Sequence, residues 1–322
     1  MADIIEQQPL VTVGICCYNR EDGFRNTLKY IAEQTYGNLE IIISQDFHPT
    51  LDLTEIVNAA NDQRITFYRQ QKQLYMYNNF RFLMEKATGD YFMWASDDDW
   101  WAPDYIEKNM ALLLNDTHAA AAHSDFYFVN ESNHKIEAYP DPLPYIQEFT
   151  ERDTVKRLKK YINQFEALGK PNLIYSIFRT SALRTQQVSD ILKVCDLSGD
   201  MLVLLSVLTH GHMAIYPGVL RTATAGNVKS YTLDANKAKR LNLLFVYMDV
   251  GGMKYMYRKW NHFINSHFSI ISRSDLPAIK KIALYPTLLK KKALFYYDVI
   301  FCNLQMRGYD IFSKIRRKQY LN

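Results

Sequence analysis

The chain has 322 residues, 48% hydrophobic and 22% charged, a composition typical of a folded protein and not of a disordered one. Its four cysteines, Cys16, Cys17, Cys195 and Cys302, exclude a disulfide framework, and no CxxC or Cys/His cluster predicts a zinc site. Without a run of about eighteen apolar residues or an N-terminal secretory signal, we expect a cytoplasmic protein.

Strands and helices alternate over roughly the first 130 residues. Apolar, β-branched runs predict strands over 10–17, 39–44, 65–69, 91–95 and 119–129. Helical spacing predicts helices near 24–32, 52–61, 78–87 and 103–114, the second with Asp52 as N-cap. This order predicts an α/β fold with a mostly parallel, Rossmann-like sheet and helices on both faces.

Beyond residue 136 the alternation weakens. We expect an amphipathic helix over 150–168, a strand over 173–179, an apolar helix over 200–210 and an extended segment over 212–224. Residues 237–322 read as helical and hold 17 Lys or Arg and 4 Asp, whereas residues 1–236 hold 21 basic and 30 acidic residues. The chain therefore divides into an acidic body, 1–236, and a basic C-terminal region, 237–322.

The basic region interleaves Lys and Arg with Tyr, Phe, Leu and Ile. This pattern is typical of a peripheral surface that lies on the inner face of an anionic membrane. A helical subdomain that packs on the body, or that forms a homodimer contact, is an equally good interpretation. Nucleic-acid binding is disfavoured because no known motif accompanies the charge.

Three consecutive aspartates, Asp97, Asp98 and Asp99, follow the fourth predicted strand. Two carboxylates about 4 Å apart repel by roughly 4 kcal/mol at an effective dielectric near 20, so we expect a cation beside them. Mg²⁺ or Mn²⁺ held by such oxygens usually shares its shell with substrate phosphates. The alternative is a solvated acidic turn before the helix near Pro103.

Ligands of open α/β sheets bind beyond the carboxyl ends of the strands. Tyr18 follows the first predicted strand, Asp46 the second, and the aspartates the fourth. We therefore expect these side chains to converge on one rim of the sheet.

Four motifs in sequence order resemble the inverting, nucleotide-sugar glycosyltransferases of family 2, which have the GT-A fold. They are VTVGICCYNR at 11–20 with QTYGNLEIII behind it, Asp46, ATGDYFMWASDDDWWAPDYI at 87–106, and SGDMLVLLSVLTHGHMAIYPGVLR at 198–221. The resemblance implies a nucleotide-binding half at about 1–130, an acceptor half at about 131–236, and a nucleotide-diphosphate sugar as co-substrate.

For the nucleotide, the resemblance implies that Tyr18 flanks the base and that Asp46 accepts a hydrogen bond from its ring N–H. Cys16 stands where the family has Thr or Ser, so one hydroxyl contact to the base is missing. Asp97 would face the ribose or share the metal.

For the metal, counting back from Pro103 places Asp98 at the ligand position of the family's aspartate motif. Asp99 would complete the metal shell through water or support the site from behind. Ala225 stands where many relatives have a histidine ligand.

For catalysis, the resemblance makes Asp200 the base that takes the proton from the acceptor hydroxyl. Its predicted place at a helix N-terminus favours the ionised form, although a plain N-cap is the alternative role, and Asp196 is a nearby competitor.

These assignments predict a metal-dependent, inverting hexosyltransferase that uses Mn²⁺ or Mg²⁺ and a UDP-sugar. Its acceptor would be a saccharide or lipid-linked saccharide in polysaccharide biosynthesis. The alternatives are a sugar nucleotidyltransferase, which would need a glycine-rich phosphate loop after the first strand, and a non-catalytic binding protein.

Overall fold

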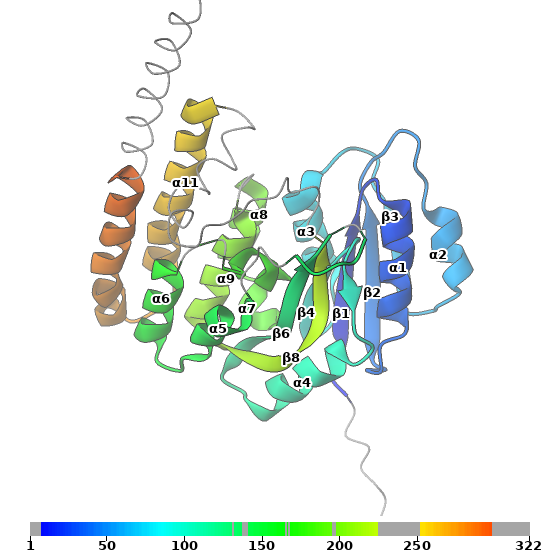
Figure 1. The fold of residues 1–322 in the computed structure, drawn as a ribbon, viewed down its shortest axis with the longest axis horizontal. Coiled ribbons are helices and arrows are strands. Elements are labelled where there is room, and N and C mark those ends of the chain that lie inside the picture. Colours follow the sequence, from blue (N-terminus) through cyan, green and yellow to red (C-terminus); the bar gives the residue numbers. More distant parts are fainter. Residues whose placement is uncertain are drawn as a thin grey trace, which may run out of the picture.

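The computed structural model describes residues 8–130, 132–136, 141–164, 166, 168–194, 198–224 and 252–297. A sheet of eight strands, ordered β3-β2-β1-β4-β7-β6-β8-β5, forms its centre (Figure 1). The strands are β1 (Val11–Cys17), β2 (Leu39–Gln45), β3 (Ile65–Arg69), β4 (Tyr91–Ser96), β5 (Trp100–Trp101), β6 (Ala119–Val129), β7 (Ile177–Arg179) and β8 (His212–Thr224).

The predicted mostly parallel α/β sheet is confirmed. Strands β1 to β4 pair in parallel, as do β6 and β8, whereas β7 and β5 are antiparallel to their neighbours. In the central register Cys16 lies between Ser44 and Ser96. The carboxyl ends of β1, β2 and β4 therefore meet at one rim, as the sequence predicts.

Helices cover both faces of the sheet (Figure 1). They are α1 (Glu21–Ala32), α2 (Thr54–Ala60), α3 (Tyr75–Lys86), α4 (Tyr105–Asn115), α5 (Leu143–Ile146), α6 (Thr154–Asn163), α7 (Thr180–Leu183), α8 (Gln186–Val194), α9 (Gly199–His210) and α11 (Gly252–Arg273), with 3₁₀ turns η1 (Gln147–Thr150) and η2 (Lys170–Tyr175). A further helix spans 278–297.

Alternate residues of the central strands contribute to two hydrophobic cores, one on each face of the sheet. Phe92 and Trp94 of β4 pack on the side of α3 and α9, while Met93 and Ala95 pack on the side of α1 and α4. This two-sided burial explains why the central strands read as nearly continuous apolar runs.

Three local predictions are wrong. The first three residues of the segment 173–179 belong to the turn η2, and only its last three residues form a strand, β7. The helix expected over 150–168 is shorter, because the Asp153 side chain accepts a hydrogen bond from Lys156 N and starts α6 at Thr154. Asp52 lies one residue too early to cap α2 and instead accepts hydrogen bonds from the Thr54 amide and hydroxyl.

The helices at the C-terminal end pack on the body, with Trp260, Phe263 and Ile264 of α11 in the same core cluster as α9. Leu284 and Leu288 of the helix 278–297 join that cluster. The domain division at residue 236 stays a prediction, because residues 225–251 lie outside the described part. Among the described helices, none combines the length and apolar character needed to span a bilayer.

The sheet curls around its carboxyl-end rim. Strand β5 follows β4 after only three residues, yet it lies four positions further along the sheet. From Ser96 to Trp100 the chain can reach about 14 Å, whereas four strand spacings in a flat sheet measure about 19 Å. The far edge must therefore bend back towards β4, and residues 97–99 bridge the gap.

Candidate active site

A cavity of about 540 Å³ lies at the rim where β1, β2 and β4 end. Its lining includes Cys16, Tyr18, Asp46, Asp97, Asp98 and Asp99, six of the seven residues predicted from the sequence. Asp200 is not among the lining residues. The cavity is completed by the N-terminal turn of α3, by η2 and by the end of β8.

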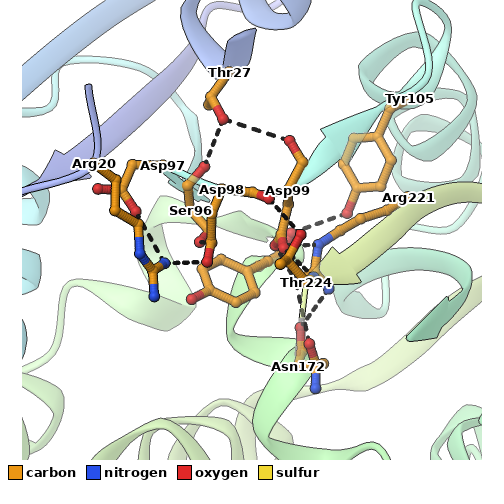
Figure 2. Close-up of polar contacts among 11 residues, drawn as sticks. Arg20, Thr27, Ser96, Asp97, Asp98, Asp99, Tyr105, Asn172, Arg221 and Thr224 are labelled. Atoms are coloured by element: carbon orange, nitrogen blue, oxygen red, sulfur yellow. Dashed lines mark hydrogen bonds and ion pairs between the residues drawn. The ribbon is translucent and has the colours of Figure 1, made fainter. Parts of the chain in front are cut away.

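Two arginines provide positive charge beside the three aspartates. The Arg20 guanidinium contacts Asp98 and lies 3.6 Å from Asp97 Oδ1, while Arg221 pairs with Asp99 (Figure 2). Burial, followed by the charge of Asp98, raises the pKa of Asp97 to about 6 even with Arg20 present. The carboxylates at 97 and 98 therefore still favour additional positive charge.

Asp99 is buried, and both oxygens of its carboxylate accept hydrogen bonds from the protein. Oδ2 accepts hydrogen bonds from Nε (3.0 Å) and Nη2 of Arg221, and Oδ1 accepts one from Thr224 N (2.9 Å). The Arg221 guanidinium stands 4.4 Å from the Tyr175 ring centroid and 5.2 Å from that of Trp101. This arrangement fits support of the site from behind, which was one of the two roles expected of Asp99.

Asp98 and Asp97 fit a divalent cation better than Asp99 does. Mg²⁺ and Mn²⁺ commonly use one or two carboxylates and complete their shell with water and phosphate oxygens. The Asp97 and Asp98 carboxylates line the cavity and already share one cationic group, Arg20. Within the described residues no group of three or more His, Cys, Asp or Glu forms an all-protein metal cage, so substrate oxygens would have to supply part of the shell.

Asp46 organises the opposite wall of the cavity. Its Oδ1 accepts hydrogen bonds from Phe47 N (2.9 Å) and Leu74 N (2.7 Å), and its Oδ2 from Tyr75 N (2.9 Å). A carboxylate has about four acceptor positions, so one on Oδ2 stays available for a ligand. Tyr75 has φ 62, a left-handed conformation that the hydrogen bond from its N–H to Asp46 helps to hold.

Exposed aromatic rings surround Asp46. Tyr18 is 39% exposed and packs edge to face with His48, and Phe47 and Tyr75 are exposed as well. Such rings provide faces on which a planar base can stack. Cys16 lines the floor between Ser44 and Ser96, and burial, with the charges of Asp97 and Asp46, raises the pKa of its thiol.

Asp200 lies at the N-terminal end of α9, outside the cavity lining. The Tyr77 hydroxyl accepts a hydrogen bond from Gly199 N (3.0 Å) and donates one to the Asp200 carboxylate. Burial raises the pKa of Asp200 to about 6, a value suited to a general base near neutral pH. Tyr77 follows directly on two cavity residues of α3, Tyr75 and Met76, but is not itself among the lining residues.

The competing base, Asp196, and the position of the absent histidine, Ala225, lie outside the described residues. No described cavity contains both Asp98 and Asp200. The catalytic role of Asp200 therefore stays a prediction.

Sequence reasoning missed the role of three cavity residues. Arg20 was visible only as part of the Tyr-Asn-Arg turn, Arg221 only as the end of the last motif, and Asn172 carried no signal. Asn172 Oδ1 accepts a hydrogen bond from Arg221 Nη2 at 3.1 Å (Figure 2). All three contacts join distant parts of the chain, which is why local patterns did not reveal them.

Comparison with known proteins gives consistent results. The sequence model described as "Glycosyl transferase family 2" matches residues 12–178. An uncharacterized glycosyltransferase of Haemophilus influenzae is 32% identical over 118 residues, 36% of each chain. The Escherichia coli enzyme WfaP, named a UDP-Glc:alpha-D-GlcNAc-diphosphoundecaprenol beta-1,3-glucosyltransferase, is 28% identical over 128 residues, 40% of this chain and 47% of that one. The matched segment thus spans less than half of either relative.

Among solved structures, S. aureus TarS 1-349 in complex with UDP has a similar fold, with a TM-score of 0.53 over 92% of this chain and 91% of that one. At 13% identity this likeness concerns the fold alone.

Proposed function

The chain belongs to glycosyltransferase family 2, and from this premise we propose that it transfers a sugar from a nucleotide diphosphate to a hydroxyl of a saccharide or lipid-linked acceptor, with inversion at the anomeric carbon. The observation that carries the proposal is the convergence of Asp46, Asp97 and Asp98, from the ends of two different strands, on one cavity. UDP is the proposed nucleotide, and polysaccharide assembly the proposed context, because the name of the E. coli relative includes a UDP-sugar and a lipid-linked saccharide.

In this proposal the nucleobase of the donor lies on the cavity wall formed by Asp46. Tyr18 flanks its face, and the remaining acceptor position of Asp46 Oδ2 takes a ring N–H. The three backbone hydrogen bonds on Asp46 hold the carboxylate in place before a ligand arrives, so its orientation costs little entropy on binding.

The diphosphate lies on the aspartate wall. Asp98, with Asp97, would hold Mn²⁺ or Mg²⁺, which when bound neutralises the charge that grows on the leaving nucleotide diphosphate. Arg20, 53% exposed at its side chain, is free to turn from the carboxylates to phosphate oxygens. Asp99 and Arg221 fix the backbone behind Asp98.

Asp200 takes the proton of the acceptor hydroxyl as that hydroxyl attacks the anomeric carbon, and Tyr77 orients the Asp200 carboxylate. A single displacement of this kind inverts the configuration and needs no covalent intermediate on the protein. Family membership disfavours the nucleotidyltransferase alternative, and Tyr18-Asn19-Arg20 after β1 is not a glycine-rich phosphate loop.

The test measures thermal stability with UDP and Mn²⁺, alone and together, followed by transfer assays with a panel of nucleotide sugars. Wild-type protein should be stabilised most by the pair, by about 2.7 kcal/mol at a ligand concentration of 100 Kd. Asp98→Asn should abolish the response to Mn²⁺ without changing the stability of the free protein.

Asp90→Asn is the matched control, because Asp90 is exposed and precedes the opposite end of β4. An Asp98→Asn variant that responds to UDP and Mn²⁺ like Asp90→Asn would refute the metal assignment. If UDP and Mn²⁺ fail to stabilise the wild type and no nucleotide sugar is turned over, the proposed donor class is wrong.

A further inference from the structure

The helix 278–297 has an apolar face on its outer side. Ile279 is 73% exposed, Ile282 61% and Leu289 59%. Together with three other exposed residues they form a row spaced by three and four, which we call the apolar stripe: Ile279, Ile282, Pro286, Leu289, Ala293 and Tyr297. In Figure 1 this helix, coloured orange, lies at the outer edge of the molecule beside α11.

In its described part, the neighbouring helix α11 does not show the same row of exposed apolar side chains. Its outward positions with the same spacing are Arg258, His262, Asn265 and Ser269, all exposed and all polar. Both helices bury an apolar face against the body through the same core cluster. Among the outward positions of the two helices whose exposure is described, a continuous apolar row occurs on the helix 278–297 alone. An extended exposed apolar patch usually marks a contact surface.

The charge around the stripe is strongly positive. Residues 252–297 hold nine Lys or Arg and one acidic residue, Asp275. Five of the nine are lysines of the helix 278–297, which itself contains no Asp or Glu. Lys291 pairs with Glu166, whereas Lys280, Lys281 and Lys292 donate to uncharged oxygens. Within the described part of the chain, Lys291 is thus the one lysine of this helix that forms an ion pair.

The apolar stripe and the positive charge around it indicate which kind of partner binds this surface. A second copy would bring two strongly positive surfaces together, which like-charge repulsion opposes. The stripe is a convex row, aliphatic apart from Tyr297, and lacks the Trp and Arg anchors that dominate protein–protein contacts. A bilayer with anionic lipids offers both an apolar layer for the stripe and negative headgroups for the lysines.

We propose that the apolar stripe of the helix 278–297 docks the protein on the surface of an anionic lipid bilayer. The helix lies parallel to the membrane, with Ile279, Ile282 and Leu289 inserted among the acyl chains and Lys290 at the headgroups. The body, with its cavity, stays in the aqueous phase at the membrane surface.

The test is co-sedimentation of the full chain with vesicles of phosphatidylcholine alone and of phosphatidylcholine and phosphatidylglycerol at a molar ratio of 7:3. The protein should bind the anionic vesicles and bind phosphatidylcholine at least tenfold more weakly. Ile279→Glu/Ile282→Glu should weaken binding to the anionic vesicles at least tenfold.

The matched control is His262→Glu/Ser269→Glu, which adds the same two carboxylates to exposed positions of α11. It should stay within about twofold to threefold of wild type, because the apolar stripe is intact. Melting temperatures establish that both variants fold. Ile279→Trp gives a second readout: its fluorescence should be quenched by brominated phosphatidylcholine in anionic vesicles, and that of Ser269→Trp should not.

The proposal is overturned if wild-type protein does not bind the anionic vesicles or if the two double variants lose binding equally. It is also overturned if Ile279→Glu/Ile282→Glu only converts a dimer to a monomer in light scattering, or if an acidic protein partner competes for the stripe while vesicles do not bind. Because no nucleotide sugar enters these measurements, their failure leaves the proposed transferase activity separately testable.

Discussion

The buried pair of Asp99 and Arg221 leads to the sharpest prediction, because the pair separates structural support from metal binding. Arg221 is 1% exposed and Asp99 5% exposed. Among the described residues other than Asp99, the Arg221 guanidinium donates only to Asn172, to its Oδ1 at 3.1 Å and its carbonyl oxygen at 3.5 Å. Replacement of Asp99 would therefore leave a buried guanidinium without a counter-charge.

Removal of one partner of a buried ion pair costs about 3–5 kcal/mol, because the other charge remains buried and unpaired. We expect Asp99→Asn to lower the free energy of unfolding by that amount in the absence of metal and nucleotide. Asp98→Asn should change it by less than about 1 kcal/mol, because its partner Arg20 is half exposed and exposed pairs contribute little.

The assay is urea unfolding followed by tryptophan fluorescence, with Asp99→Leu, Arg221→Met and the double variant completing a cycle. The double variant should recover most of the loss, because it leaves no unpaired charge. The reasoning is refuted if Asp99→Asn loses less than about 1 kcal/mol, or if the losses of the two single variants simply add in the double variant. Retained stability with a lost Mn²⁺ response would make Asp99 a metal ligand.

Three further predictions address packing, catalysis and the C-terminal helix. A Cβ on Gly23 would lie 2.4 Å from the carbonyl oxygen of Asp97 and would displace the aspartate segment, so Gly23→Ala should weaken UDP and Mn²⁺ binding at least tenfold in calorimetry. Gly37→Ala, whose Cβ would have no atom within 4 Å, should leave binding unchanged. If Asp200 is the base, kcat/KM should fall as the pH drops below about 6, because the protonated carboxyl cannot accept a proton, and Asp200→Asn should abolish turnover with unchanged UDP affinity. Burial would raise the pKa of Glu166, but the charges of Lys291 and Lys170 outweigh it and hold the pKa at about 2. The ionised Glu166 therefore stabilises the fold above pH 4.5, and this contribution is lost as the pH falls towards 2. The loss of unfolding free energy in Glu166→Gln should shrink over the same pH range.

Each of these three has a result that contradicts it. Equal binding by the two alanine variants would mean that the aspartate segment tolerates displacement. A pH profile of kcat/KM without an acidic limb near 6 would remove Asp200 as the base. A Glu166→Gln deficit in the free energy of unfolding that is independent of pH would show that the loss comes from packing, not from charge.

The N-terminal half of the fold was predictable because its information is local. The central strands are buried on both faces, so runs such as 39–44 and 91–95 appear as apolar segments, and the residues that follow them fall on the rim by the geometry of a parallel sheet. The position of the cavity could therefore be inferred without contacts between distant residues.

The C-terminal half was less predictable because tertiary contacts override local preference. Leu173 and Ile174 read as strand residues, yet Gly169, with φ 91, and Pro171 turn the chain into η2. The pairing of Arg221 with Asp99 spans 122 residues, and no local pattern encodes it. The same limit applies to the start of α9, where Gly199 N donates a hydrogen bond to the Tyr77 hydroxyl, again across 122 residues.

The three-residue bridge between β4 and β5 limits how this protein can admit its ligands. Many enzymes gate a cleft by swinging two rigid lobes apart, but here both lobes belong to one sheet and the acidic residues themselves join its inner strand to its curled edge. A swing of this kind would displace the side chains of Asp97 and Asp98 directly. We therefore expect ligand entry and product release to depend on segments outside the sheet, with little change in the aperture of the sheet itself.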